Sequence, residues 1–429
     1  MSALTLRGRA FLAAGVTAVA CAIVLGQPML TRVGILLTAV PLITAAVVGQ
    51  GRYRLALVRT VSPDLVAAGQ AARVQLALTN EGRTPTGVLL LEDQVPYVLG
   101  TRPRFVLEGI GHGWRRHVTY QVRSDVRGRF EIGPMTVRVS DPFGMVELGR
   151  AFRTTAALTV TPRTVALPTI PLGGAWTGSG DNRPRAFATG SAEDVTVREY
   201  RHGDELRRVH WPSSARLGEL MVRREEQPWQ SRATLFLDNR IIAHRGQGIA
   251  SSLEAAVSLT ASVAIHLSQR GFTVRLVTAT GEDPGASWHF REAELNTGPL
   301  LEALAVVQPT ARTVIDTGWL SEASQGGLLV AVFGSLEDAD ASVLRRMQHH
   351  AVSSLAVALD VQAWTTPLAG GSGAVPALTR QGWRAVPLRP GDRFENVWQD
   401  LGRLVGRGGG TAAGTAAGTD PALQSAGSP

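Results

Sequence analysis

The stretch Ala233-Thr234-Leu235-Phe236-Leu237-Asp238 is an apolar run that ends in an acid. Unbroken apolar runs of this length are typical of strands that are buried on both faces of a parallel sheet. A helical pattern, Ala250–Arg270, follows and leads through Gly271 into a second strand, Phe272–Thr278. This order of strand, helix and strand predicts an α/β domain built on a parallel sheet.

The same alternation continues to residue 405. Further strands are expected at Leu328–Gly334, Ser354–Asp360 and Trp383–Leu388, and helices at Pro299–Val307, Leu336–His349 and Arg393–Leu404. We therefore expect an α/β domain over residues 232–405. The tail, 406–429, consists mainly of Gly, Ala and Thr, cannot bury a core, and is expected to be disordered.

The acid at the end of the first strand lies where open α/β sheets bind ligands. The arrangement resembles a von Willebrand factor A domain, which binds Mg²⁺ there through the pattern D-x-S-x-S. This chain has Asp238-Asn239-Arg240-Ile241-Ile242 instead. Mg²⁺ needs near-octahedral oxygen ligands, and an arginine beside it would repel it. We predict a von Willebrand A-like scaffold with a degenerate site at Asp238 and no metal, in which Asp238 accepts hydrogen bonds from the next loop or pairs with Arg240.

Residues 55–167 show short segments with alternating polar and apolar residues, among them Ala72–Leu78, His117–Val122 and Met135–Val139. Turn signals separate them, and strands at this spacing predict a β-sandwich domain. One of these turns is Asp141-Pro142-Phe143-Gly144. We interpret it as the closure of a strand pair in preference to a loop for partner recognition.

Two N-terminal stretches, Ala10–Gly26 and Val33–Gly49, contain no charged residue and are each close to the minimum length for a membrane-spanning helix. The short connector Gln27–Arg32 makes them antiparallel. We therefore predict a transmembrane hairpin over residues 1–54. A cleaved signal peptide is the main alternative, but it needs no second, returning span.

Arginines flank the pair of spans unequally. Arg7 and Arg9 precede the first span, three more follow the second at positions 52, 54 and 59, and only Arg32 lies in the connector. Because cytoplasmic segments carry the excess of positive charge, this pattern places both ends in the cytoplasm. We expect a multi-pass cell-membrane protein with cytoplasmic globular domains.

Composition excludes several kinds of chemistry. The chain has no lysine, so a Walker-type phosphate loop and Schiff-base chemistry are ruled out. Its single cysteine, Cys21, lies within an apolar run, which excludes disulfides and cysteine-rich zinc sites. No cofactor is indicated.

Residues 168–231 combine a linker, glycine-rich from Leu172 to Gly190, with the densest polar stretch of the chain, Val197–Arg216. This stretch resembles the signature of a bacterial family, domain of unknown function 58, of the form R-E-Y-x-x-G-D-x-x-R-x-x-W-x-x-S-A-R. The pattern is interrupted by His210 and Pro212, where the family usually has an acid or amide and a lysine. The matching residues are Arg198, Glu199, Tyr200, Gly203, Asp204, Arg207, Trp211, Ser214, Ala215 and Arg216.

Two interpretations of this signature remain open. Glu199, Asp204, Arg207 and Arg216 can form ion pairs that hold a loop in place, or the same arginines can bind a carboxylate or phosphate of a partner or ligand. The resemblance implies a partner of the MoxR type, an ATPase of the AAA+ class. We therefore expect a non-enzymatic, membrane-anchored adaptor protein.

Two other functions remain as alternatives. A hydrolase would use Ser213 or Ser214 with His210 and Asp204. A nucleic-acid binder would use the arginines, but these are spread along the chain and not massed in one block, so we do not expect nucleic acid as a partner.

Overall fold

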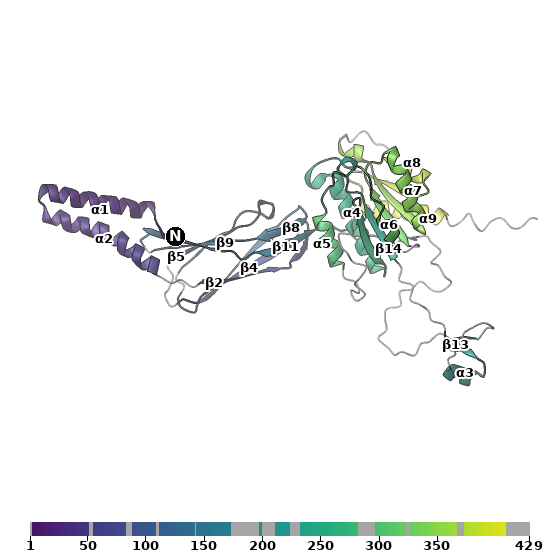
Figure 1. Ribbon diagram of the computed structural model, residues 1–429, viewed down its shortest axis with the longest axis horizontal. Helices are drawn as coiled ribbons and strands as arrows, with labels where there is room; N and C mark the ends of the chain where they lie inside the picture. The colour runs from purple at the N-terminus through teal and green to yellow at the C-terminus, as the bar shows by residue number, and fades with distance from the viewer. Residues whose placement is uncertain are drawn as a thin grey trace, which may run out of the picture. The chain divides into compact units, whose positions relative to one another are not determined.

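The chain divides into two compact units (Figure 1). The first comprises Met1–Thr164 with Leu301–Val307, and the second comprises Val165–Leu300 with Gln308–Pro429. The computed structural model describes residues 2–50, 55–82, 88–108, 111–141, 143–172, 197–199, 211–223, 232–281, 297–322, 327–366 and 373–408.

The first unit begins with two helices, α1 (Leu6–Leu25) and α2 (Pro28–Gln50). Both are long and apolar enough to span a membrane, with mean hydropathies of 1.9 for Leu6–Leu25 and 1.7 for Pro28–Ala46. The chain reverses at Gly26, whose φ of 63° favours glycine. The expected connector Gln27–Arg32 is wrong, because α2 already begins at Pro28. Proline has its φ preset for the first helical position, where no backbone donor is needed.

Glycines allow these two helices to approach closely. A Cβ on Gly34 would lie 2.7 Å from Cγ2 of Val19 and 2.8 Å from its backbone nitrogen, and one on Gly15 would collide with Thr38. Small residues at such a crossing are the usual basis of tight helix packing in membranes.

The rest of the first unit is β-rich. The predicted strands at 72–78, 117–122 and 135–139 are confirmed as parts of β4, β7 and β9. One antiparallel sheet has the order β1 (Ser2–Leu4), β10 (Val146–Phe152), β9 (Met135–Ser140), β5 (Val88–Asp93) and β6 (Arg104–Leu107). A second has the order β2 (Leu55–Ser62), β4 (Ala71–Asn80) and β7 (Arg115–Arg123). A third, mixed sheet has the order β3 (Leu65–Ala67), β11 (Ala156–Thr161) and β8 (Gly128–Ile132), in which β3 is parallel and β8 antiparallel to β11.

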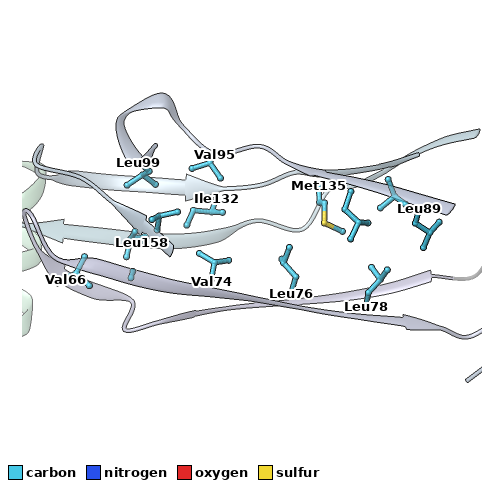
Figure 2. Close-up of a cluster of buried hydrophobic side chains, with 14 of the residues drawn as sticks. Val66, Val74, Leu76, Leu78, Leu89, Val95, Leu99, Ile132, Met135 and Leu158 are labelled. Carbon is cyan, nitrogen blue, oxygen red and sulfur yellow. The ribbon is translucent and has the colours of Figure 1, made fainter. Parts of the chain in front are cut away.

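The core of this unit comes from alternate residues of its strands. In β4 every second residue from Ala72 is buried, so one face of the strand points inward. Figure 2 shows Leu76 and Leu78 of this face opposite Met135, with Ile132 and Leu158 in the same cluster.

A buried ion pair interrupts this apolar core. Arg59 donates to the Oδ1 atom of Asp93 at 2.5 Å and to the carbonyl oxygen of Thr154. The hydroxyl of Tyr120 donates to Oδ2 of Asp93 at 2.6 Å, and burial and this hydrogen bond raise the pKa of Tyr120 above its ordinary value. Arg59 was counted among the charges that flank the second span. In the folded protein its charge is buried and is paired with Asp93.

The second unit contains a five-stranded parallel sheet, which confirms the predicted α/β content. Its order is β15 (Thr273–Thr278), β14 (Arg232–Leu237), β16 (Leu328–Phe333), β17 (Ser353–Leu359) and β18 (Arg384–Leu388). The helices in this part of the chain are α4 (Ser252–Gln269), α5 (Gly298–Val306), α6 (Trp319–Glu322), α7 (Ala341–His350), α8 (Val375–Arg380) and α9 (Phe394–Gly408).

Apolar residues cover the sheet on one face as a single cluster. Phe236 of β14 and Phe333 of β16 contact each other there, and Leu344 and Leu378 reach the same cluster from α7 and α8. The segment Leu301–Val307, which contains most of helix α5, groups with the first unit, where Arg127 donates hydrogen bonds to the carbonyl oxygens of Leu304 and Val307.

The segment Val165–Leu172 is held to the rest of the second unit by several hydrogen bonds. The indole nitrogen of Trp398 donates to the carbonyl of Pro168 at 3.1 Å, and Arg270 donates to that of Ile170 at 3.0 Å. Val165 donates to the Ser262 hydroxyl, and the Ser353 hydroxyl donates to Leu172. The predicted linker, Leu172–Gly190, lies outside the described residues except for Leu172. The predicted disordered tail, 406–429, is wrong at its start, because α9 continues to Gly408, and its remainder lies outside the described residues.

Candidate functional site

The site begins at the carboxyl end of β14. The backbone nitrogen of Asp238 bonds to Val332 of the neighbouring strand, so the carboxylate follows directly from the sheet. Arg240 then forms an isolated parallel bridge with Thr310. These backbone contacts hold Asp238 and Arg240 on the edge where parallel sheets bind ligands.

The guanidinium of Arg240 lies between two carboxylates. Nε and Nη2 donate to Asp238, each at 2.9 Å. Nη1 and Nη2 donate to Asp340 at 2.9 and 3.2 Å, and Nη1 also donates to the carbonyl oxygen of Thr313 at 2.8 Å. All five N–H groups of the guanidinium therefore have acceptors.

Burial makes this ion triad a fixed part of the scaffold. The side chain of Arg240 is 1% exposed, and those of Asp238 and Asp340 are 0% and 6% exposed. Burial alone would lower the pKa of Arg240, but the hydrogen bonds and charges of the two aspartates outweigh it and raise the pKa above its ordinary value. The arginine stays charged, and the predicted pairing of Asp238 with Arg240 is confirmed.

Sequence reasoning missed Asp340, the second carboxylate. It ends the short helical turn Asp338–Asp340 and precedes α7. Its Oδ2 accepts from the backbone nitrogen of Glu337 at 3.1 Å, and that capping box fixes the side chain. An acid at the start of the helix that follows β16 was the available signal, because this helix begins at the same edge of the sheet as Asp238.

His244 supports the triad from the following loop. Its Nε2 lies 2.6 Å from the carbonyl oxygen of Asp238, and because a carbonyl only accepts, Nε2 carries the hydrogen. Nδ1 then accepts from the Ser252 hydroxyl at 3.0 Å. Burial lowers the pKa of His244, which favours this neutral form. Ser252 is fully buried, so this serine–histidine pair is a structural contact without access for a substrate.

The arrangement supplies its own cation. One guanidinium makes two-point contacts to both carboxylates, and its single positive charge offsets one of their two negative charges. Among the described residues, no group of three or more His, Cys, Asp or Glu side chains is placed to hold a metal ion. Chemically, the triad cross-links β14 to the start of α7.

Three apolar side chains next to the triad or to its partner Thr313 in sequence are exposed. Ile241 and Ile242 follow Arg240 in the chain, and Val314 follows Thr313, which accepts a hydrogen bond from Arg240. All three side chains are exposed. The rigid ion triad thus underlies a surface that a protein partner could cover.

The family-like signature contributes a second small structure. Strand β12 (Val197–Glu199) pairs antiparallel with β13 (Met221–Arg223), with Arg198 opposite Val222. Helix α3 (Trp211–Leu217) precedes β13. The hydroxyl of Ser214 accepts from the backbone nitrogen of Met221 at 2.8 Å and links the helix to the strand.

The structure brings together only some of the predicted signature residues. Arg198 and Glu199 lie on β12, and Trp211, Ser214, Ala215 and Arg216 lie on α3. The pinning by ion pairs and the hydrolase with His210 and Asp204 therefore remain untested. The positions outside the described residues are Tyr200, Gly203, Asp204, Arg207 and His210.

Helix α3 exposes its large apolar side chains. Trp211 is 67% exposed and Leu217 is 63% exposed. Ala215 and Arg216, between them in sequence, are also exposed. Sequence reasoning named Trp211 and Arg216 but not Leu217, because the signature pattern ends at Arg216.

A family model described as protein of unknown function DUF58 matches residues 196–360. This match supports the DUF58 family. It spans β12, α3, the Asp238–Arg240–Asp340 triad and β17, so the DUF58 match includes both parts of the site.

Comparisons with other proteins add little. No curated protein matches the chain. The CARDB domain of a Pyrococcus furiosus protein, whose crystal structure contains di-metal ions, is 14% identical with a TM-score of 0.19, and the alignment covers 25% of this chain and 93% of that one. A putative ApaA protein from Bordetella pertussis is 15% identical with a TM-score of 0.21, over 26% of this chain and 97% of that one. Likenesses at these scores carry no argument about the fold or the function.

Proposed function

We propose that this protein is a non-catalytic, membrane-anchored adaptor that binds a protein partner through helix α3. The observation that carries the proposal is the exposure of Trp211 and Leu217 within the signature segment. Burying a large apolar side chain contributes about 1.5–3 kcal/mol, so a surface that covers both gains a substantial part of its binding energy from two contacts. Tryptophan and arginine, here Trp211 and Arg216, are also the residue types most enriched at interface hot spots.

The second unit also contains the Asp238–Arg240–Asp340 triad. We interpret it as a von Willebrand A-like scaffold in which Arg240 occupies the position between Asp238 and Asp340 where a cation would otherwise bind. A metal-independent scaffold suits an adaptor, because its shape does not change with the local Mg²⁺ concentration. We interpret the β-rich part of the first unit as a β-sandwich, with sheets on either side of the core drawn in Figure 2.

The two N-terminal helices are the proposed anchor. Arg7 and Arg9 are exposed at the start of α1, while Arg32 is the only charged residue near the turn at Gly26. This asymmetry supports a hairpin with both ends in the cytoplasm. The globular parts then face the cytoplasm, where an ATPase can reach them.

The proposed partner is an ATPase of the AAA+ class, of the MoxR type. The DUF58 match over residues 196–360 and the signature resemblance support this choice, which is an argument by association and rests on no contact in this chain. A partner that binds helix α3 must provide an apolar pocket for the indole of Trp211 and an acidic group for Arg216.

The test is a crosslinked pull-down from membranes that express the full chain. Trp211→Ala is compared with Tyr97→Ala, because Tyr97 is an aromatic residue of the first unit that is 91% exposed and lies outside the signature. We expect an AAA+ ATPase with the parent chain and with Tyr97→Ala, and its loss with Trp211→Ala. The variants Asp204→Ala and Arg207→Ala test the rest of the signature in the same assay.

The outcomes separate the interpretations. If the ATPase is recovered equally with Trp211→Ala, the signature is a structural element and the partner binds elsewhere. If no ATPase is recovered with the parent chain, the adaptor proposal fails.

A further inference from the structure

The turn between β9 and β10 presents an aromatic side chain to solvent. Asp141 is buried, and its carboxylate accepts from the backbone nitrogens of Phe143 at 3.0 Å and Val146 at 2.6 Å. Gly144 has a φ of 69°, which glycine adopts without strain. The Asp141 carboxylate thus bonds to backbone nitrogens of its own turn. Phe143 is nevertheless 63% exposed, so its ring has no role in the core.

The same turn is bonded to the start of the first apolar helix. The Thr5 hydroxyl donates to the carbonyl oxygen of Gly144 at 2.6 Å, and the Thr5 backbone nitrogen donates to that of Met145 at 2.9 Å. Thr5 is also the N-cap of α1, since its hydroxyl accepts from Gly8. A Cβ on Gly8 would collide with the Met145 carbonyl, so this position needs glycine.

Side-chain packing fixes the depth of the turn along the helices. Met145 and Val146 are buried against Val40 and Ala45 of α2. The apolar run of α2 continues to Gly49, nine residues after Val40 and four after Ala45. At 1.5 Å per residue, the residues packed against the turn lie about 6–14 Å from that end. Phe143 therefore lies at the level where one end of the proposed hairpin leaves the apolar layer.

We propose that Phe143, between β9 and β10, is a membrane-interface residue whose ring inserts between the lipid headgroups beside α1. The inference rests on the proposed spanning hairpin and extends it to the β-rich part of the same unit. Aromatic side chains concentrate at this depth of a bilayer, and phenylalanine is a common apolar contact of elements that lie in the interface.

Positive charge next to the turn matches the phosphates of anionic lipids. Arg7 is exposed, and its Nη1 lies 3.8 Å from the position that a Cβ on Gly144 would occupy. Arg9 is exposed two residues later. A ring inserted among headgroups, with guanidinium groups beside it, combines the two attractions that hold interfacial segments on a membrane.

The test places a photoreactive phenylalanine analogue in the full chain, reconstituted in nanodiscs that contain anionic phospholipid. It replaces Phe143, Tyr97 or Ile23 in three separate variants. Tyr97 is the matched control, an exposed aromatic residue that follows β5 at the end of that strand away from the turn, since Val88 pairs with Ser140. Ile23 is exposed on α1 and tests the hairpin itself.

We expect lipid adducts at positions 143 and 23, with on the order of tenfold more adduct at 143 than at 97, because burial of the ring in lipid favours the contact. Adducts at 23 without adducts at 143 would leave the hairpin intact and overturn the interfacial role of Phe143. Crosslinks from 143 to protein in place of lipid would also overturn it. If positions 23 and 143 both fail to label lipid, the hairpin proposal fails and this inference fails with it.

Discussion

Replacing Arg240 with alanine leaves two buried carboxylates, Asp238 and Asp340, without the guanidinium that bonds to both. Removing one partner of a buried ion pair costs about 3–5 kcal/mol, because the remaining charge keeps its desolvation penalty. For a unit of this size, a loss of 1 kcal/mol lowers the melting temperature by roughly 2–4 °C. We therefore expect Arg240→Ala to melt about 6–20 °C below the parent chain.

The measurement is thermal unfolding of the full-length protein in detergent, followed by tryptophan fluorescence. Trp319, Trp383 and Trp398 are buried in the second unit and report its unfolding. The control replaces the whole triad with neutral residues, as Asp238→Asn, Arg240→Met and Asp340→Asn. Neutral replacement of a complete buried ion network is often without cost, so this variant should melt near the parent chain.

A pH series makes the prediction sharper. Without Arg240, two carboxylates held close together should share a proton, which the folded variant then binds more tightly than the unfolded chain. The stability deficit of Arg240→Ala should therefore shrink between pH 7.5 and pH 5. A deficit below about 1 kcal/mol at pH 7.5, or one that stays constant with pH, would refute the assignment of the triad as an electrostatic cross-link.

Two further predictions concern other parts of the chain. Burial lowers the pKa of His244 below 6.5, so its contribution to stability is present above pH 6.5 and is lost as the pH falls through the folded pKa. The melting temperature of His244→Gln should therefore fall less between pH 7 and pH 5 than that of the parent chain. An equal fall in both proteins would contradict this. Gly34→Leu should force α1 and α2 apart, because a Cβ at this position would lie only 2.7 Å from Cγ2 of Val19. The distance between spin labels on Cys21 and on Leu30→Cys measures the separation of the helices. The control Ile35→Leu, at an exposed position, should leave that distance unchanged.

Much of the secondary structure followed from hydrophobic periodicity. The predicted helix Ala250–Arg270 corresponds to α4, Ser252–Gln269, and the predicted strand Leu328–Gly334 corresponds to β16, Leu328–Phe333. Such elements are long or apolar enough for local pattern to decide them. The connector was placed wrongly because its bounds were taken from the two uncharged apolar runs, whereas helix α2 already begins at Pro28.

The site was harder to predict because its partners are distant in sequence. The pairing of Asp238 with Arg240 is local and could be expected from their spacing. Asp340 lies 100 residues after Arg240, and only the parallel order of β14 and β16 brings it into contact. Arg59 shows the converse, since its place in the sequence indicated a membrane flank while its side chain bonds to Asp93 in a core.

Strand β1 gives the chain an order of assembly. Ser2 pairs with Leu148, so a strand made before the two apolar helices forms one edge of a sheet whose other strands are made after them. At synthesis rates of roughly 5–20 residues per second, that partner appears about 7–30 s after Ser2. The apolar helices α1 and α2 are complete well before then, so insertion of the hairpin precedes closure of the sheet. A tag inserted directly before Ser2 would crowd the strand that covers the otherwise open edge of β10, whereas the same tag placed after Gly408 would leave this pairing undisturbed.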